Sequence, residues 1–290
     1  AGIVPGDERW EYDDLLQLRQ RVEDAGLVLE ALENVPLKFY DQVMLGGPDR
    51  DRQIENMVYT VRNIARAGIP IFGYHWMPTL VGRTLLTTKI RAGAQVTAFD
   101  LEEASKRPLL MDRRYTEDEM WENLEHWIKI IIPVAEEEGI RTGIHPCDPP
   151  VAELQGIPQL FRSFEAYKRL IGIVESPSNC IEFCQGTFSE MEDAKGDGIY
   201  EMIEYFGERE KILYVHFRNV SETVPNFQEE FINTGHVDMY RAMESYKKIG
   251  FEGMFVDDHV PIVVGDSPWG HRGRAFANGY IQALMDVVDR

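Results

Sequence analysis

Histidine, cysteine and acidic residues gather at the ends of several short β-branched or aromatic stretches of this sequence. Four of the seven histidines fall at such ends. The residues there that could do chemistry are Tyr74, His75, His145, Glu182, Cys184, His216, Arg218, Asn219, Asp258 and His259. Imidazole, thiolate and carboxylate groups are common protein ligands of divalent metals, and they also transfer protons. The pattern therefore predicts a metal-dependent active site.

The side chains that best suit a metal come one each from four stretches. They are His145, Cys184, His216 and Asp258. A sulfur ligand favours Zn²⁺ or Fe²⁺ over Mn²⁺ or Mg²⁺, so the residue types alone leave the ion open. Glu182 lies two positions before Cys184 and therefore on the same strand face, where it is a candidate fifth ligand or base. Taken singly, a histidine at a strand end is more often a hydrogen-bonded structural residue than a ligand, and a lone cysteine there is usually a packing residue, but together the four favour a metal site.

The elements that must position these residues alternate as strand and helix along the whole chain. Strands are predicted at 3–4, 27–32, 69–74, 142–145, 181–184, 212–217 and 253–257, and helices at 12–25, 50–67, 116–138, 164–171, 198–206, 238–249 and 272–287. Thr116 and Glu119 form a capping box at the start of one helix, and Pro133 is expected to kink it. Strands separated by helices predict a parallel sheet.

Repeated βα units without a G-x-G-x-x-G motif favour a (β/α)8 barrel over a Rossmann sheet. We expect one barrel domain over residues 1–290. Barrel enzymes carry their active sites at the carboxyl ends of the strands, where the candidate residues lie. Six or seven strands are found instead of eight, which leaves open a missing first βα unit.

The charge balance and cysteine content restrict the partners and the compartment. The chain has 49 acidic and 30 basic residues and a net charge of -19, which repels nucleic acid and anionic membranes. Three cysteines are too few for a disulfide framework and suit a reducing compartment. No stretch approaches the roughly 20 apolar residues that span a bilayer. We expect a soluble, cytoplasmic protein without nucleic-acid or membrane partners.

The segment from about 79 to 115 is too long for an ordinary βα loop. It contains seven basic residues against four acidic ones, which is unusual in so acidic a chain: Arg83, Lys89, Arg91, Lys106, Arg107, Arg113 and Arg114. We expect a lid that brings positive charge to an anionic sugar, with Arg83 contacting the substrate. A subunit-contact arm is a compatible alternative, and we expect a homodimer.

Several motifs resemble those of one enzyme family. GIHPCDPP resembles the HPDDPP signature of the mannonate dehydratases, and IEFCQGTF, VHFRNV, GHVDMY and VDDHV are similar to FCxGS, VHxRN, GDVDMY and RPDHG in the same order. YHWMP, Arg83-Thr84 and Phe99-Asp100 extend the resemblance over nearly the whole chain. The resemblance implies a xylose-isomerase-like barrel, a bound Mn²⁺ ion and the removal of water from D-mannonate to give 2-keto-3-deoxygluconate.

The resemblance also assigns roles. It places the metal ligands on His145, Cys184, His216 and Asp258, and proton transfer on His259. Cys147 departs from the family, because it replaces the first Asp of HPDDPP. The segment 268–272 reads PWGHR and lacks the tyrosines that the family has there. His271 or Tyr74 is expected to take over their role in proton transfer.

The remaining expected contacts orient the substrate. They are Arg218, Asn219, Arg83, His75 and Asp148, and Asp148 is also expected to orient the shell around the metal. Arg218 has a second interpretation, as the buried structural partner of a carboxylate. The main alternative function is a metal-dependent sugar isomerase or epimerase, for which Glu182 offers a base. A third is a protein that binds sugar acids without catalysis.

Overall fold

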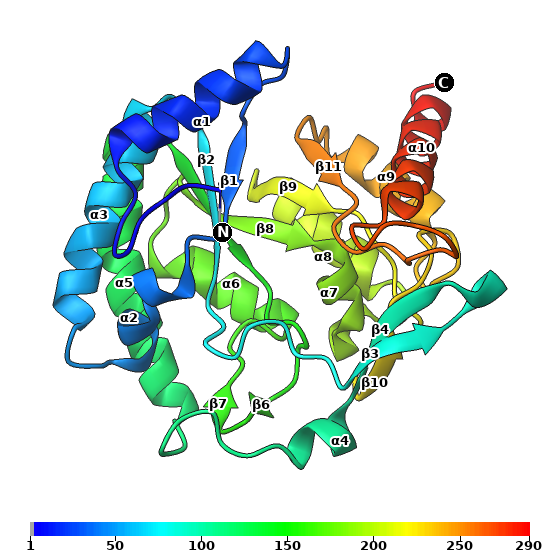
Figure 1. The fold of residues 1–290 in the computed structure, drawn as a ribbon, viewed down its shortest axis with the longest axis horizontal. Helices are drawn as coiled ribbons and strands as arrows, with labels where there is room; N and C mark the ends of the chain where they lie inside the picture. The colour runs from blue at the N-terminus through cyan, green and yellow to red at the C-terminus, as the bar shows by residue number, and fades with distance from the viewer. Residues whose placement is uncertain (1–2) are drawn as a thin grey trace. The chain divides into compact units, whose positions relative to one another are not determined.

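The computed structural model describes residues 3–290, which form two compact units (Figure 1). Unit 1 consists of residues 3–78, 115–145 and 165–182, and unit 2 of residues 79–114, 146–164 and 183–290. In the described part of the chain, no helix is both long and apolar enough to cross a membrane. A single barrel domain over residues 1–290 stays a prediction, of which residues 1 and 2 lie outside the described range.

Unit 1 contains a parallel sheet with the strand order β1, β2, β5, β8. The strands are β1 (Ala31–Glu33), β2 (Ile71–His75), β5 (Arg141–His145) and β8 (Asn179–Cys184), of which β8 ends in unit 2. The helices of this unit are α1 (Tyr12–Asp24), α2 (Asp41–Leu45), α3 (Arg50–Arg66), α5 (Glu117–Glu137) and α6 (Phe164–Ile173), and η1 (Leu37–Phe39) is a 3₁₀ turn. The parallel pairing and the helix positions confirm the sequence-based predictions.

Helix α5 shows how the sequence sets a boundary and a buried face. The hydroxyl of Thr116 accepts from the Glu119 backbone N–H, and the Glu119 carboxylate accepts from the Thr116 N–H. This capping box satisfies backbone donors that have no partner within the helix. The apolar face of α5 buries Trp127, whose ring contacts Tyr40 and Tyr74 at centroid distances of 5.7 and 5.6 Å. Unit 1 therefore has an aromatic core between sheet and helix.

Unit 2 contains both parallel and antiparallel strands. Strands β9 (Ile212–His216) and β11 (Met254–Val256) pair in parallel, whereas β3 (Leu85–Lys89), β4 (Gln95–Asp100) and β10 (Asn226–Gln228) form an antiparallel sheet, as do β6 (Glu153–Leu154) and β7 (Ile157–Pro158). The helices are α4 (Leu101–Ser105), α7 (Gln185–Glu190), α8 (Gly198–Gly207), α9 (Met239–Lys248) and α10 (His271–Val288), with 3₁₀ turns η2 (Arg91–Gly93) and η3 (Glu192–Ala194). The antiparallel strands were not expected from the sequence.

Two predicted strands differ from the structure. Residues 3 and 4 form a bend and not a strand. The strand predicted at 27–32 occurs later, as β1, because Leu27 and Val28 are exposed and give no buried face to pair.

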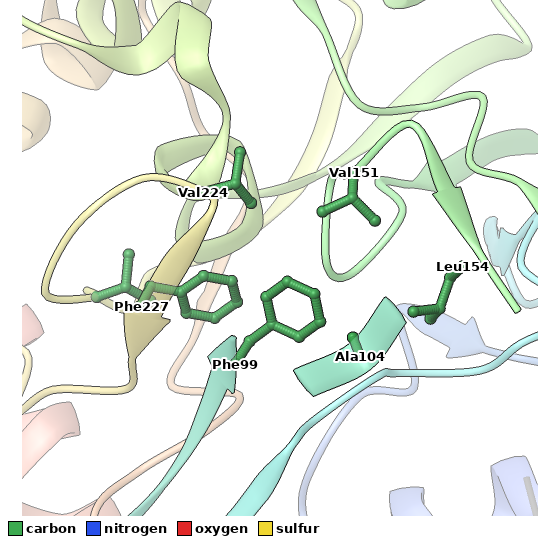
Figure 2. Close-up of a cluster of buried hydrophobic side chains, with 7 residues drawn as sticks. Phe99, Ala104, Val151, Leu154, Val224 and Phe227 are labelled. Atoms are coloured by element: carbon green, nitrogen blue, oxygen red, sulfur yellow. The ribbon is translucent and has the colours of Figure 1, made fainter. Parts of the chain in front are cut away.

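A buried apolar cluster packs the antiparallel sheet of unit 2. Figure 2 shows the rings of Phe99 of β4 and Phe227 of β10 next to each other. Their centroids lie 5.7 Å apart, and the ring planes are tilted by 32°. The cluster consists of Phe99, Ala104, Val151, Leu154, Val220, Val224 and Phe227. It joins the chain segments 99–104, 151–154 and 220–227 and so fixes the long segment 79–114 within unit 2.

Candidate metal centre and active site

A cavity of about 720 Å³ opens within unit 2. One wall comes from β3, β4 and the residues around them, and the other from the segments that follow β10 and β11. Its chemically active lining consists of Arg83, Glu229, Asp258, His259, Asp266, Trp269 and Arg274. The segment expected to be a lid therefore contributes to a cavity wall. Whether it opens and closes stays a prediction.

Three of the four predicted metal ligands approach one another in unit 2. Cys184 ends β8, His216 ends β9, and Asp258 follows β11. The Asp258 Oδ2 atom lies 3.9 Å from Cys184 Sγ and 3.6 Å from His216 Nδ1. A ring nitrogen of His216 lies within 4.8 Å of the same sulfur. One thiolate, one imidazole and one carboxylate at these separations fit a divalent cation.

Asp258 is held in a conformation that few non-glycine residues adopt. Its φ is 46°, in the left-handed region where Asp is among the better tolerated residues. The Arg218 Nε–H donates to Oδ2 at 2.9 Å, which leaves Oδ1 3.7 Å from His259 Nε2. The carboxylate is therefore fixed by backbone and side-chain contacts.

The fourth predicted ligand, His145, belongs to unit 1. It ends β5, and its Nε2 lies 3.9 Å from Oε1 of Glu182 on β8. His75 is the register partner of His145 on β2. Burial and the neighbouring His145 lower the pKa of His75 to about 4, so His75 is neutral at neutral pH. A carboxylate oxygen of Glu33 on β1 lies within 4.8 Å of a carboxylate oxygen of Glu182.

A buried network of two arginines and several carboxylates supports the cavity in unit 2. The Arg83 guanidinium group donates to both oxygens of Asp148, and to Glu229 Oε1 at 2.8 Å. Arg218 donates from Nη2 to Asp148 at 3.0 Å and from Nη1 to Glu229 at 3.0 Å. Arg218 Nη1 also donates to Glu190 at 3.1 Å. Each of these side chains is at most 5% exposed.

This network changes the interpretation of both arginines. The structure supports Arg218 as the buried partner of carboxylates, and it gives Arg83 the same role through Asp148 and Glu229. Both guanidinium groups are occupied, so neither is the free cation that we expected to orient or attract an anionic sugar. Asp148 holds the network together through Arg83 and Arg218, and its expected role in orienting the shell around the metal site stays a prediction.

The network also sets opposite pKa shifts in its acids. Burial opposes the ionisation of Asp148, but Arg83 and Arg218 together hold its pKa well below the usual value. Burial likewise opposes the ionisation of Glu229, yet Arg218 and His259 lower its pKa to about 2. Burial and the Asp148 carboxylate raise the pKa of Glu190 well above its usual value. Glu190 is thus the acid of the network that is easiest to protonate.

His259 lies half-buried in the cavity wall and contacts two carboxylates. Its Nδ1 is 3.0 Å from Glu229 Oε1, and its Nε2 is 3.7 Å from Asp258 Oδ1. Burial acts against the charged ring, but the carboxylates of Asp258 and Glu229 outweigh it and raise the pKa of His259. The protonated form is therefore favoured, which suits a group that gives a proton.

Tyr74, Asn219 and His271 are among the predicted residues that do not line this cavity. Tyr74 is 1% exposed and packs on Phe72 and on Trp127 of α5, on the strand face opposite His75. Asn219 donates to the backbone oxygens of Ile232 and Val237 and so holds a loop of unit 2. His271 is exposed at the start of α10, where its Nδ1 is 2.6 Å from Ser267 Oγ. These positions give structural roles to all three.

Cys147, the residue that departs from the family motif, is fully buried. Burial raises the pKa of its thiol to about 12, so the thiolate is scarce at neutral pH. Its backbone N–H donates to the oxygen of Phe161 at 2.9 Å. Cys147 is therefore a packing residue and not a nucleophile.

Sequence reasoning did not find Glu229, Glu190, Trp269 or Arg274 as residues of the site. Arg274 pairs with Asp257, and its guanidinium carbon lies 4.3 Å from the centroid of the Trp269 ring. The only signal for these two was the segment PWGHR, which contains Trp269 and ends two positions before Arg274. Glu229 and Glu190 lie in stretches without a recognisable motif.

Solved structures of sugar-converting enzymes share the fold of this chain. A D-tagatose 3-epimerase-like protein is similar over 96% of this chain and 83% of its own, with a TM-score of 0.59 and 15% identity. An L-ribulose 3-epimerase covers 95% of this chain and 81% of its own, with a TM-score of 0.58 and 13% identity. The chain has the xylose-isomerase-like (β/α) barrel fold, which confirms the predicted fold class.

A higher similarity defines the family. The D-mannonate dehydratase family model matches residues 3–114 and 104–290. The mannonate dehydratase of Thermotoga maritima is 30% identical over 328 residues, which cover 99% of this chain and 89% of the relative. The crystal structure of mannonate dehydratase from Streptococcus suis serotype 2 covers 98% of this chain and 83% of its own, with 30% identity and a TM-score of 0.86.

The chain therefore belongs to the mannonate dehydratase family, a family of metal-dependent hydro-lyases. This confirms the resemblance inferred from the short motifs. Membership of the family does not by itself assign roles to individual residues, so the roles that the motifs suggested stay predictions.

Proposed function

We propose that this protein is a metal-dependent sugar-acid dehydratase that converts D-mannonate to 2-keto-3-deoxygluconate and water. The observation that carries the proposal is the meeting of Asp258 with Cys184 and His216 beside a His259 that is bound to Glu229, in a chain of this family. Asp258 and His259 line the same cavity, so a proposed metal ligand and a proposed proton donor both border the space where the reaction would take place.

We propose Cys184, His216, Asp258 and His145 as the ligands that hold the ion. His145 is included because it ends a strand and matches the family motif. We propose Mn²⁺ as the ion, with Zn²⁺, Fe²⁺ and Mg²⁺ as the alternatives. When bound, a divalent cation stabilises the negative charge that develops on the carboxylate oxygens as the neighbouring carbon loses its proton.

His259 moves the proton in this proposal. Dehydration removes a proton from the carbon next to the carboxylate, which solvent water accepts, and a hydroxyl group from the following carbon, and the enol that forms tautomerises to the 2-keto acid. The raised pKa of His259 favours the protonated ring more than in a free imidazole, and in this proposal the ring proton passes to the departing hydroxyl oxygen as the C–O bond breaks and water leaves. Cavity-lining Trp269 and Arg274 border the space that the sugar acid would occupy.

The experiment combines metal analysis with a product assay. The purified protein is analysed for bound metal and then incubated with D-mannonate and other aldonates, with and without a chelator. We expect a 2-keto-3-deoxy acid that reacts with semicarbazide, loss of product after chelation and recovery with Mn²⁺. The variant Cys184→Ser should bind the metal more weakly. Failure to form a 2-keto-3-deoxy acid from any aldonate with added Mn²⁺ would overturn the proposal.

A metal-dependent isomerase or epimerase is the second candidate. The buried Glu182 carboxylate beside His145 in unit 1 favours it, because a carboxylate base can return a proton to a neighbouring carbon or to the opposite face. Product analysis separates the two, since an isomerase product keeps the elements of water. Binding of aldonates without turnover would support the third candidate, a non-catalytic binding protein. A cytoplasmic location, a homodimeric state and the absence of nucleic-acid or membrane partners stay predictions.

A further inference from the structure

Glu229 is the acid that links His259 to the buried arginines. It follows β10 and is 4% exposed. Its Oε1 accepts from Arg83 at 2.8 Å and lies 3.0 Å from His259 Nδ1, while its Oε2 accepts from Arg218 at 3.0 Å. Both carboxylate oxygens are thus engaged, and the side chain cannot rotate without breaking two charge-assisted hydrogen bonds.

Glu229 is fixed from the backbone as well. Its N–H donates to the backbone oxygen of Thr97 on β4 at 3.0 Å. The preceding residues of β10 pair with β4 in the antiparallel sheet, where Phe227 packs against Phe99 (Figure 2). The backbone that carries the Glu229 carboxylate is therefore held in place by the sheet, and a residue must be held in this way in order to orient another side chain.

Glu190 is a second buried glutamate of the network and can be compared with Glu229. It is fully buried in the same network and pairs with Arg218 at 3.1 Å and with Arg83 at 3.9 Å. In the part of the chain that the structure describes, its side-chain contacts do not include His259. Two acids of one type thus share the same arginines, and only one of them contacts the histidine.

We propose that Glu229 is the positioning residue of His259. It accepts the Nδ1–H of the ring, so that Nε2 is the nitrogen that exchanges a proton with the substrate. The proposal rests on the dehydratase function proposed above, in which the Nε2 proton passes to the departing hydroxyl group. Glu229 touches neither substrate nor metal in this role, and it acts only through the histidine.

The test compares two near-isosteric variants, Glu229→Gln and Glu190→Gln. Each removes one carboxylate from the network, but only the first replaces the charged acceptor of the His259 Nδ1–H by a weaker neutral amide. Three quantities are measured for both: kcat and KM with D-mannonate, the thermal unfolding midpoint, and the ¹⁵N-imidazole NMR signals of His259 in the diamagnetic Mg²⁺-loaded protein.

We expect Glu229→Gln to lower kcat roughly 10- to 100-fold with KM changed less than about threefold, as is typical for partners that orient a functional histidine. The His259 Nδ1 signal should shift in this variant and stay in place in Glu190→Gln. Equal losses of kcat in both variants, or an unmoved His259 signal in Glu229→Gln, would overturn the proposal.

The NMR comparison keeps this inference separate from the proposed function. If the wild-type protein does not dehydrate any aldonate, the proposed function fails. The imidazole signals then still decide whether Glu229 orients His259, because they require no turnover.

Discussion

Asp148 offers the most direct test of how the buried network stabilises unit 2. Its carboxylate is 1% exposed and accepts from two nitrogens of Arg83, from Arg218 at 3.0 Å and from Thr187 Oγ1 at 3.4 Å. In Asp148→Asn, one oxygen becomes an amide group that faces guanidinium donors. Removing one partner of a buried ion pair typically costs about 3 to 5 kcal/mol, because the remaining charge stays buried without compensation.

The residues around Asp148 place the expected loss of stability in Asp148→Asn at the lower end of that range. Burial and the Asp148 carboxylate raise the pKa of Glu190, and Glu190 already lies next to both arginines. When the charge of Asp148 is removed, ionisation of Glu190 becomes more favourable, and its charge can partly replace that of Asp148. We therefore expect a loss of about 3 kcal/mol in the free energy of unfolding, with a midpoint lowered by about 6 to 9 °C.

Urea unfolding followed by circular dichroism measures this loss at neutral pH. The control is Glu23→Gln, which breaks an exposed pair with Arg19 and should cost less than about 0.5 kcal/mol. The double variant Asp148→Asn with Glu190→Gln should lose more than the sum of the single variants, because it removes the replacement charge. A loss for Asp148→Asn no larger than that of the control, or strict additivity, would refute this reasoning.

Two further predictions concern pH and His271. The folded pKa of Glu229, about 2, lies below the ordinary value of 4.5, so its stabilising contribution is complete above pH 4.5 and is lost as the pH falls toward 2. Urea titrations across this window should show a shallower decline for Glu229→Gln than for the wild type, and parallel curves would count against the assignment. His271→Ala should change kcat by less than about twofold, because His271 is exposed and does not line the cavity. Loss of a general acid or base would instead lower kcat about 100-fold or more. A larger loss of kcat in a turnover assay would contradict this prediction and support a catalytic role for His271.

Local patterns in the sequence predicted the helices and the barrel. The capping box of Thr116 and Glu119 acts over only four residues, so it can be recognised without knowing the fold. The strand-end rule of barrels then selected Cys184, His216 and Asp258, which the structure brings together within unit 2. By contrast, Tyr74 and His75 were both expected in the active site, although adjacent residues of a strand point to opposite faces of the sheet. Only one of the two can therefore face the site.

The buried network could not be read in this way. Arg83 was expected to contact an anionic substrate, but it pairs with Asp148 and Glu229, which lie 65 and 146 positions away in the sequence. Their proximity depends on the antiparallel pairing of β10 with β4, and β10 has only three residues. So short a strand has no period that a sequence pattern can reveal. Residues that depend on such pairings are the ones that sequence reasoning missed.

The pairing of β4 with β10 also has a consequence for biosynthesis. Strand β4 leaves the ribosome more than a hundred residues before β10 exists, and loop closure over that distance is slow compared with helix formation. During this interval the edge of β4 and the Phe99 ring are open to solvent and to other nascent chains. We therefore expect aggregation during synthesis to begin at this edge, and chaperones that shield apolar strands to act on this segment first.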